Sequence, residues 1–221
     1  TELSGGQRTK VLLAKLLLEE MKGMGIEDAM MDEYGYVYGH IPATPGYENC
    51  TAIGFLAHMD TAPDYSGENV NPQIIENYDG KDVVLGTSGR TLTVKDFPSL
   101  KNMTGKTLIT TDGTTLLGAD DKAGIAEIMT VAEELLKGDI PHGKVCLAFT
   151  TDEEVGLLGA KALDCSQLKG KYLINMDSEE EGYLWVSCAG GLSAITTIPV
   201  RYQEVSGEKY ELVISGLNGG H

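Results

Sequence analysis

Four short motifs in this 221-residue chain combine histidine and carboxylate side chains, and each lies next to an apolar run or a helical pattern. One histidine with several carboxylates makes a mixed nitrogen and oxygen ligand set that suits Zn²⁺, Mn²⁺ or Co²⁺. If the motifs converge in the fold, a bound cation offsets the mutual repulsion of the carboxylates. The motifs are His58-Met59-Asp60, Gly118-Ala119-Asp120-Asp121, Thr151-Asp152-Glu153-Glu154 and Asp177.

Each motif alone also has an ordinary structural explanation. A histidine at a strand end, such as His58, is more often a hydrogen-bonded structural residue, and a pair such as Glu153-Glu154 is more often a solvated surface feature. Asp120 is placed where it would cap the helix that follows it. The metal-site prediction therefore rests on the order of all four motifs and on their places at the ends of predicted elements.

Three segments have the apolar spacing of amphipathic helices. The first covers residues 7–24, with Ser4 as its predicted N-cap, the second covers residues 122–137, and a shorter one covers residues 156–163. Their apolar stripes predict that these helices pack on a sheet.

Short apolar or alternating runs between these helices predict strands. Strands that alternate with helices are typical of the α/β class, so we expect a mostly parallel central sheet with helices on both faces. Open sheets of this class place ligands at the carboxyl ends of their strands, where the four motifs lie. The predicted strands are residues 35–40, 52–57, 145–150 and 173–176, with a hairpin of residues 107–111 and 114–117 around Asp112-Gly113.

The pattern changes to strands alone after Gly182, at residues 184–188, 194–202 and 208–214. We expect a catalytic domain over residues 1–190 and the start of a truncated α+β lid or dimerisation domain over residues 191–221. The Gly-, Asn- and Pro-bearing segment 63–82 predicts a long surface loop.

The composition restricts the partners. The net charge is −16, from 33 acidic and 17 basic residues, so nucleic acid and anionic membranes are not expected to bind. The four cysteines are widely separated and form no CxxC pair. No apolar stretch approaches the roughly 20 residues of a membrane span and no signal-peptide pattern is present, which favours the cytoplasm.

Most of the chain, over about residues 20–164, resembles the M20 metallopeptidase family, and specifically its tripeptide-hydrolysing branch. The resemblance is carried by residues 53–60, 69–78, 107–129 and 140–143 and by residues 151–156. It implies a zinc-dependent aminopeptidase with an M20-like catalytic domain, two zinc ions in a complete active site, and short peptides as substrates. Manganese or cobalt is an alternative metal.

The resemblance assigns metal ligands by position. His58 and Asp177 resemble ligands of the first zinc, Asp120 resembles the carboxylate that bridges both metals, and Glu154 resembles a ligand of the second zinc. In the family the peptide bond after the bridging aspartate is cis, so a cis Asp120-Asp121 bond is expected.

The resemblance also assigns catalytic roles. Asp60 resembles the acid that orients the imidazole of His58, and Glu153 resembles the general base that deprotonates a water bridging the two metals. His221 resembles a lid histidine that assists the transition state.

The C-terminal part resembles a different branch of the same family, one that hydrolyses Xaa-His dipeptides, through residues 174–182, 187–191 and 216–221. An Xaa-His dipeptide is therefore the alternative substrate. No residue resembles the family's second-site histidine, which predicts one tight and one weak metal. A homodimer is expected only if the lid is completed.

Two other interpretations remain open. Residues 3–18 resemble the signature helix of ABC ATPases, but no GxxxxGK[ST] loop accompanies them, so we expect only an amphipathic helix. The alternative to an enzyme is a catalytically incomplete metal-binding fragment or scaffold.

Overall fold

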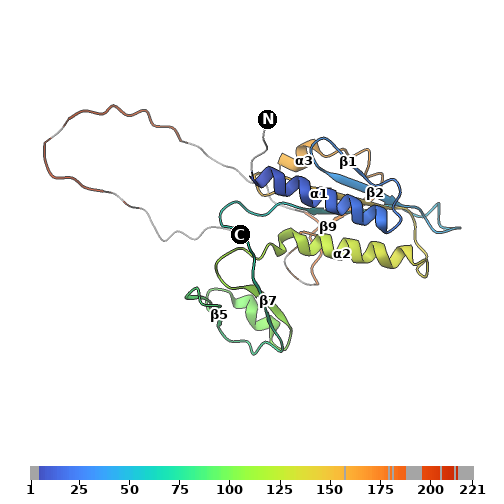
Figure 1. The fold of residues 1–221 in the computed structure, drawn as a ribbon, viewed down its shortest axis with the longest axis horizontal. Helices are drawn as coiled ribbons and strands as arrows, with labels where there is room; N and C mark the ends of the chain where they lie inside the picture. The colour runs from blue at the N-terminus through green and yellow to red at the C-terminus, as the bar shows by residue number, and fades with distance from the viewer. Residues whose placement is uncertain are drawn as a thin grey trace. The chain divides into compact units, whose positions relative to one another are not determined.

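The computed structural model describes residues 5–156, 158–178, 180, 182–187, 196–204, 206–211 and 213, with residues 5–10 described by their backbone alone. The chain divides into two units, Thr1–Leu184 and Trp185–His221. The helices and strands of the described residues all lie in the first unit (Figure 1).

The strands predicted after Gly182 are not confirmed. None of the described residues between 184 and 213 belongs to a strand. Their large apolar side chains, among them Val186 and Tyr202, are exposed. A strand needs a paired neighbour and a packed face to be stable, and the described residues of this unit provide neither.

Two long helices form where the apolar spacing predicts them. Helix α1 is Gly5–Gly23 and helix α2 is Ala119–Leu136. Along α1 the buried residues Ala14, Leu17 and Met21 follow the 3.6-residue period, so this helix packs on the sheet as expected. Among the described residues, no helix has the length and apolar content of a membrane span.

The central sheet has the strand order β1-β2-β8-β3-β9. Strand β3 runs parallel to both β8 and β9, whereas β2 runs antiparallel to both β1 and β8. The strands are β1 (Met30–Met31), β2 (Val37–Ile41), β3 (Ile53–His58), β8 (Val145–Thr150) and β9 (Tyr172–Asn175).

The sheet is therefore mixed, and the expectation of a mostly parallel sheet needs correction. Parallel strands require a long crossover, usually a helix. The segment between β2 and β3, residues 42–52, holds no helix, and β2 runs opposite to β3 across the intervening β8. The tight connection from β1 to β2 likewise makes that pair antiparallel.

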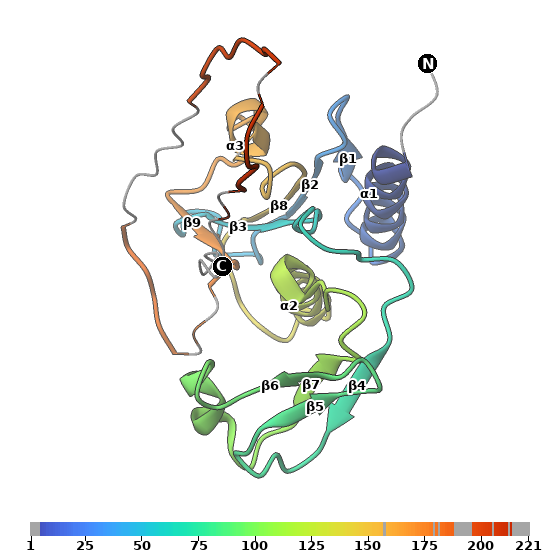
Figure 2. The same ribbon diagram turned by 90° about the vertical axis from the view of Figure 1, so that its left-hand side faces the viewer.

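Helices cover both faces of this sheet, as predicted. Residues of α1 and α2 share one apolar core with β2, β3 and β8, including Ala14, Ile128 and Phe149. On the opposite face, Tyr36 and Tyr38 pack with Ala148, and the Tyr36 hydroxyl donates to the carbonyl of Gly159 in the short helix α3 (Leu158–Ala162). Figure 2 shows α2 and α3 on opposite sides of the sheet.

A small subdomain is inserted between β3 and α2. It contains β4 (Pro72–Ile75), β5 (Val83–Leu85), β6 (Arg90–Leu92), the 3₁₀ helix η1 (Pro98–Met103) and β7 (Leu108–Thr111). Strands β4 and β7 form one antiparallel pair and β5 and β6 another (Figure 2). Tyr78, Val83, Leu85 and Leu100 form its separate apolar core.

Two predictions for this region are wrong. Segment 63–82 is not purely a loop, because β4 lies within it, and residues 114–117 form no hairpin strand with β7. Asp112 accepts a hydrogen bond from the backbone N–H of Thr114, and the N–H of Leu116 donates to the carbonyl of Ser66. The chain therefore turns towards the 61–70 segment instead of folding back along β7, whose partner is β4.

Candidate metal centre

The pairing register brings the motifs to one edge of the sheet. His58, the last residue of β3, lies opposite Thr150, the last residue of β8, and Leu56 lies opposite Asn175, the last residue of β9. The three strands are parallel, so the residues that follow them leave the sheet on the same side. Asp177 and the segment 151–154 therefore lie beside His58, as the strand-end argument predicts.

His58 is the centre of this cluster, and its side chain is 3% exposed. Its Nε2 atom lies 2.8 Å from a carboxylate oxygen of Asp120, 3.6 Å from one of Asp177 and 4.0 Å from one of Glu153. Its Nδ1 atom lies 3.0 Å from the backbone carbonyl of Asp60, which only accepts hydrogen bonds. Nδ1 therefore carries a proton and Nε2 faces the carboxylates.

The electrostatics of His58 are dominated by these carboxylates. Burial acts to lower the pKa of the imidazole, but hydrogen bonds to Asp177, Asp60 and Asp120 outweigh burial and raise the pKa to about 11. In the metal-free protein the ring is therefore an imidazolium at neutral pH, where it offsets part of the acidic charge.

Ligand atoms of two residue trios lie within 4.8 Å of one another, which is the spacing a metal ion requires. One trio is His58, Asp120 and Glu154, and the other is His58, Asp121 and Asp177. All four sequence-predicted metal residues belong to these trios. The donor set of imidazole and carboxylates fits zinc, manganese or cobalt, so the residues present fit the expected metal.

Asp60 is buried beneath this cluster. Its two carboxylate oxygens accept hydrogen bonds of 3.1 Å from the backbone N–H groups of Glu153 and Glu154. Burial acts to raise the pKa of Asp60, but hydrogen bonds from His58 and from these two amides lower it to about 2. The backbone carbonyl oxygen of Asp60 lies 3.0 Å from His58 Nδ1 and the carboxylate of Asp60 lies 3.5 Å from it, so the carbonyl is the nearer acceptor. Asp60 thus positions both the imidazole and the Glu153-Glu154 loop.

Asp121 is the site residue that the sequence analysis missed. It is 3% exposed, and its carboxylate accepts a hydrogen bond of 3.2 Å from the backbone N–H of His58. Burial is the main cause that raises the pKa of Asp121 to about 6. The Asp120-Asp121 peptide is cis, which confirms that expectation. The doubled aspartate at the helix start was the available signal, but an adjacent pair does not show which member faces inward.

A lysine completes the surroundings of the cluster. The Nζ atom of Lys122 donates a hydrogen bond of 2.5 Å to the hydroxyl of Thr61, in the segment that follows β3. Burial is the main cause that lowers the pKa of Lys122, while the surrounding carboxylates act in the opposite direction. The sequence analysis attached no role to this residue.

The two other histidines of the described residues lie elsewhere. His40 pairs in register with Cys146, near the amino end of β8, and its ring contacts the carboxylate of Asp28 at 2.7 Å. The Nδ1 atom of His142 contacts the carbonyl of Gly143. His221 lies outside the described residues.

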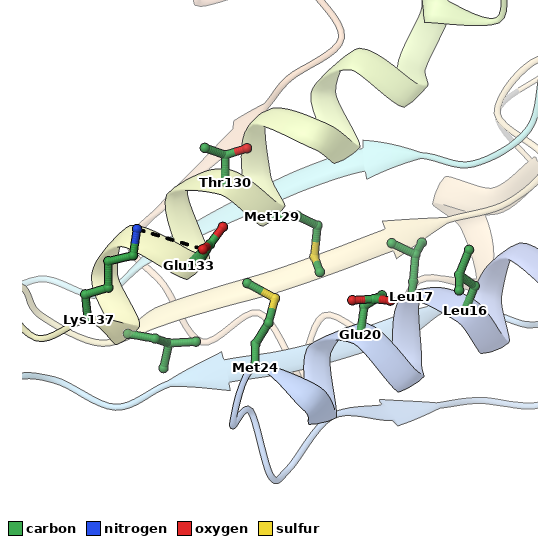
Figure 3. A pocket seen from close by; sticks show the side chains of 9 residues that line it. Leu16, Leu17, Glu20, Met24, Met129, Thr130, Glu133 and Lys137 are labelled. Carbon is green, nitrogen blue, oxygen red and sulfur yellow. Dashed lines mark ion pairs between the residues drawn. The ribbon is translucent and has the colours of Figure 1, made fainter.

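A cavity in the described part of the chain borders the cluster. It has a volume of about 340 Å³ and is lined by Asp120, Asp121 and Asp177 together with Glu127 and Met176. A larger, mostly apolar cavity of about 740 Å³ lies between α1 and α2, and its lining includes Leu17, Met24 and Met129 together with Glu20 and Glu133 but no residue of the four motifs (Figure 3). The cavity beside Asp120 is therefore the one relevant to chemistry.

Known proteins resemble this chain over much of its length. Peptidase T of Geobacillus thermodenitrificans (strain NG80-2) is 50% identical over 188 residues, which make up 84% of this chain and 45% of that relative. The chain resembles peptidase T. A family model described as M42 glutamyl aminopeptidase also matches residues 103–182.

Solved structures extend the resemblance to peptidase T and to a dipeptidase. Aminopeptidase PepT from Bacillus cereus ATCC 10987 is 30% identical with a TM-score of 0.56, over 76% of this chain and 38% of that chain. Aminoacylhistidine dipeptidase from Vibrio alginolyticus is 27% identical with a TM-score of 0.53, over 81% of this chain and 30% of that chain. Both branches named by the sequence resemblance are thus represented, and the chain spans less than half the length of these relatives.

Proposed function

We propose that this chain is the metal-binding part of a zinc-dependent aminopeptidase of the M20 type that hydrolyses short peptides, with tripeptides as the main substrates. One observation supports the proposal above all: His58, Asp120, Glu154 and Asp177 converge at one sheet edge in a chain that resembles peptidase T. Xaa-His dipeptides are the alternative substrates.

His58, Asp120, Glu154 and Asp177 would hold the metals, which when bound would supply polarisation of the scissile carbonyl and a lowered pKa for the attacking water. Glu153 takes a proton from the attacking water and passes it to the leaving amine. Burial raises the pKa of Glu153, so its carboxylate is a stronger base than an exposed glutamate. Asp60 holds Glu153 in place through the backbone hydrogen bond.

We further propose two metal positions of unequal affinity, with manganese or cobalt as substitutes for zinc. His221 is proposed to assist the transition state, by its resemblance to the family's lid histidine. A cytoplasmic location, short peptides as the only partners, and a homodimer if a lid is completed are part of the same proposal. The free state of Cys50, Cys146 and Cys165 is compatible with a reducing compartment.

The test is metal analysis after dialysis together with peptide hydrolysis. The wild type is expected to retain at least one zinc ion per chain and Asp120→Ala to lose it. Hydrolysis of a free tripeptide but not of the N-acetylated tripeptide would support an aminopeptidase, and a parallel assay with an Xaa-His dipeptide decides between the substrates. Zinc bound without hydrolysis would leave a metal-binding chain without activity, and no zinc in either protein would overturn the proposal.

A further inference from the structure

The loop that follows β8 carries the proposed base, and it folds back onto itself. The backbone N–H of Gly159 in α3 donates a hydrogen bond of 3.2 Å to the carbonyl of Asp152. A Cβ added to Gly159 would lie 1.9 Å from the carbonyl oxygen of Thr151, so α3 begins directly against the backbone of these two residues. A restraint on Gly159 is therefore a restraint on the backbone that leads into Glu153.

This backbone has an unfavourable conformation that its surroundings must maintain. Asp152 has a φ of 59°, in the left-handed region that costs free energy for a residue other than glycine. Such a conformation persists where neighbouring contacts hold it. The next two backbone N–H groups, those of Glu153 and Glu154, reach the carboxylate oxygens of Asp60 at 3.1 Å each. Asp60 therefore provides one of the contacts that hold this turn, and Gly159 provides another.

Tyr36, the residue before β2, fixes Gly159. Its hydroxyl donates a hydrogen bond of 2.9 Å to the carbonyl of Gly159, and the residue is 3% exposed. Its ring packs edge-on against the ring of Tyr38, with the centroids 6.5 Å apart. The backbone N–H of Tyr36 donates to the carboxylate of Asp32 at 2.9 Å. Because ring and backbone are both held, the hydroxyl is a rigid donor to Gly159.

We propose that Tyr36 is a positioning residue for the loop that carries Glu153 and Glu154: through Gly159, its hydroxyl holds the turn at Asp152 that presents both glutamates to the cluster. The inference rests on the proposed function for the role of Glu153 as the base, and it adds a residue that lies outside all four motifs. Tyr36 is not itself a catalytic residue, since it acts on Glu153 through the backbone.

Hydrogen exchange of the metal-free protein, followed amide by amide with NMR, tests the hold on the loop. Tyr36→Phe removes the hydroxyl and keeps the ring, so the apolar packing is retained. The backbone N–H groups of Glu153 and Glu154 are expected to exchange about fivefold to tenfold faster than in the wild type, because a buried hydrogen bond that limits opening of the loop is lost. The amides of β3 are expected to exchange at the wild-type rate.

Tyr38→Phe is the matched control. Tyr38 packs on the same face of the sheet, but its hydroxyl accepts a hydrogen bond of 3.2 Å from the backbone N–H of Asp164, beyond α3. Its loss is expected to leave the exchange of Glu153 and Glu154 unchanged. Equal acceleration in both variants, or acceleration that extends to β3, would indicate a general loosening and overturn the assignment to Tyr36.

Hydrolysis of a tripeptide by the zinc-loaded protein separates the inference from the proposed function. Tyr36→Phe is expected to lower kcat by about threefold to tenfold with KM within about twofold of the wild type, because a displaced base slows proton transfer without removing substrate contacts. An unchanged kcat, or unchanged exchange at Glu153, would overturn the role of Tyr36 alone. No hydrolysis by the wild type, with faster local exchange in Tyr36→Phe, would overturn the proposed function and retain Tyr36 as the residue that holds the loop.

Discussion

The carboxylate of Asp60 accepts a hydrogen bond of 3.1 Å from the backbone N–H of Glu153, 93 residues away in sequence. The second oxygen of the same carboxylate accepts from the next amide, that of Glu154. One buried acid thus fixes the loop that carries both the proposed base and a proposed metal ligand. Asp60 therefore links the position of His58 on β3 to the loop that follows β8.

Asp60→Asn is expected to lower the free energy of unfolding of the metal-free protein by about 2 kcal/mol, since the pKa of Asp60 falls from 3.8 to about 2 on folding. A depressed acid pKa stabilises the fold above pH 3.8, and this stabilisation is lost as the pH falls through about 2. Urea unfolding from pH 5 to pH 2 should show this loss in the wild type. A variant with the same pH dependence as the wild type would contradict the assignment.

Binding of the first zinc ion at pH 7 is expected to release about one proton. The reason is that the pKa of His58 in the metal-free protein is about 11, and a metal ligand must be deprotonated. Titrations in buffers of different ionisation enthalpy measure this number. At pH 5, below the raised pKa of Asp121 of about 6, a second proton is expected. Binding enthalpies that do not depend on the buffer at pH 7 would rule out the charged His58.

Much of the site was predictable because it depends on where strands end. The apolar run of β8 matches its predicted bounds, and β3 ends at His58, one residue beyond its predicted end. Once three parallel strands end at one edge, the residues that follow them must meet there. The candidate metal ligands could therefore be placed together before any tertiary contact was known.

The remainder depends on tertiary contacts that local patterns do not encode. The direction of β2 follows from its pairing with β8, and β7 pairs with β4 instead of with the residues after Asp112. The carboxylate of Asp121 accepts a hydrogen bond from the backbone N–H of His58, 63 residues away in sequence, and this bond fixes its inward orientation. Each of these features is decided by a partner distant in sequence.

Gly159→Ala is expected to lower the free energy of unfolding by about 2 kcal/mol, because a Cβ at this buried position would lie 1.9 Å from the backbone oxygen of Thr151. The backbone at Thr151 must shift, which displaces the loop that carries Glu153, so zinc affinity should fall as well. Gly23→Ala is the matched control, since nothing lies within 4 Å of its added Cβ at the end of α1. Equal thermal stability of the two variants would contradict the expected clash.

Glu153→Gln and Glu154→Gln are expected to separate catalysis from metal binding, although the two residues are adjacent. Glu154 belongs to a candidate metal trio, whereas Glu153 Oε2 lies 4.0 Å from His58 Nε2 and is proposed as the base. Glu153→Gln should therefore keep the zinc content while lowering kcat by a factor of about 10²–10⁴, the range of general base catalysis. Glu154→Gln should lose the weaker zinc. Both substitutions are isosteric and remove one charge, so a general electrostatic effect would change the two variants alike. Zinc lost from Glu153→Gln, with full content in Glu154→Gln, would reverse the assigned roles.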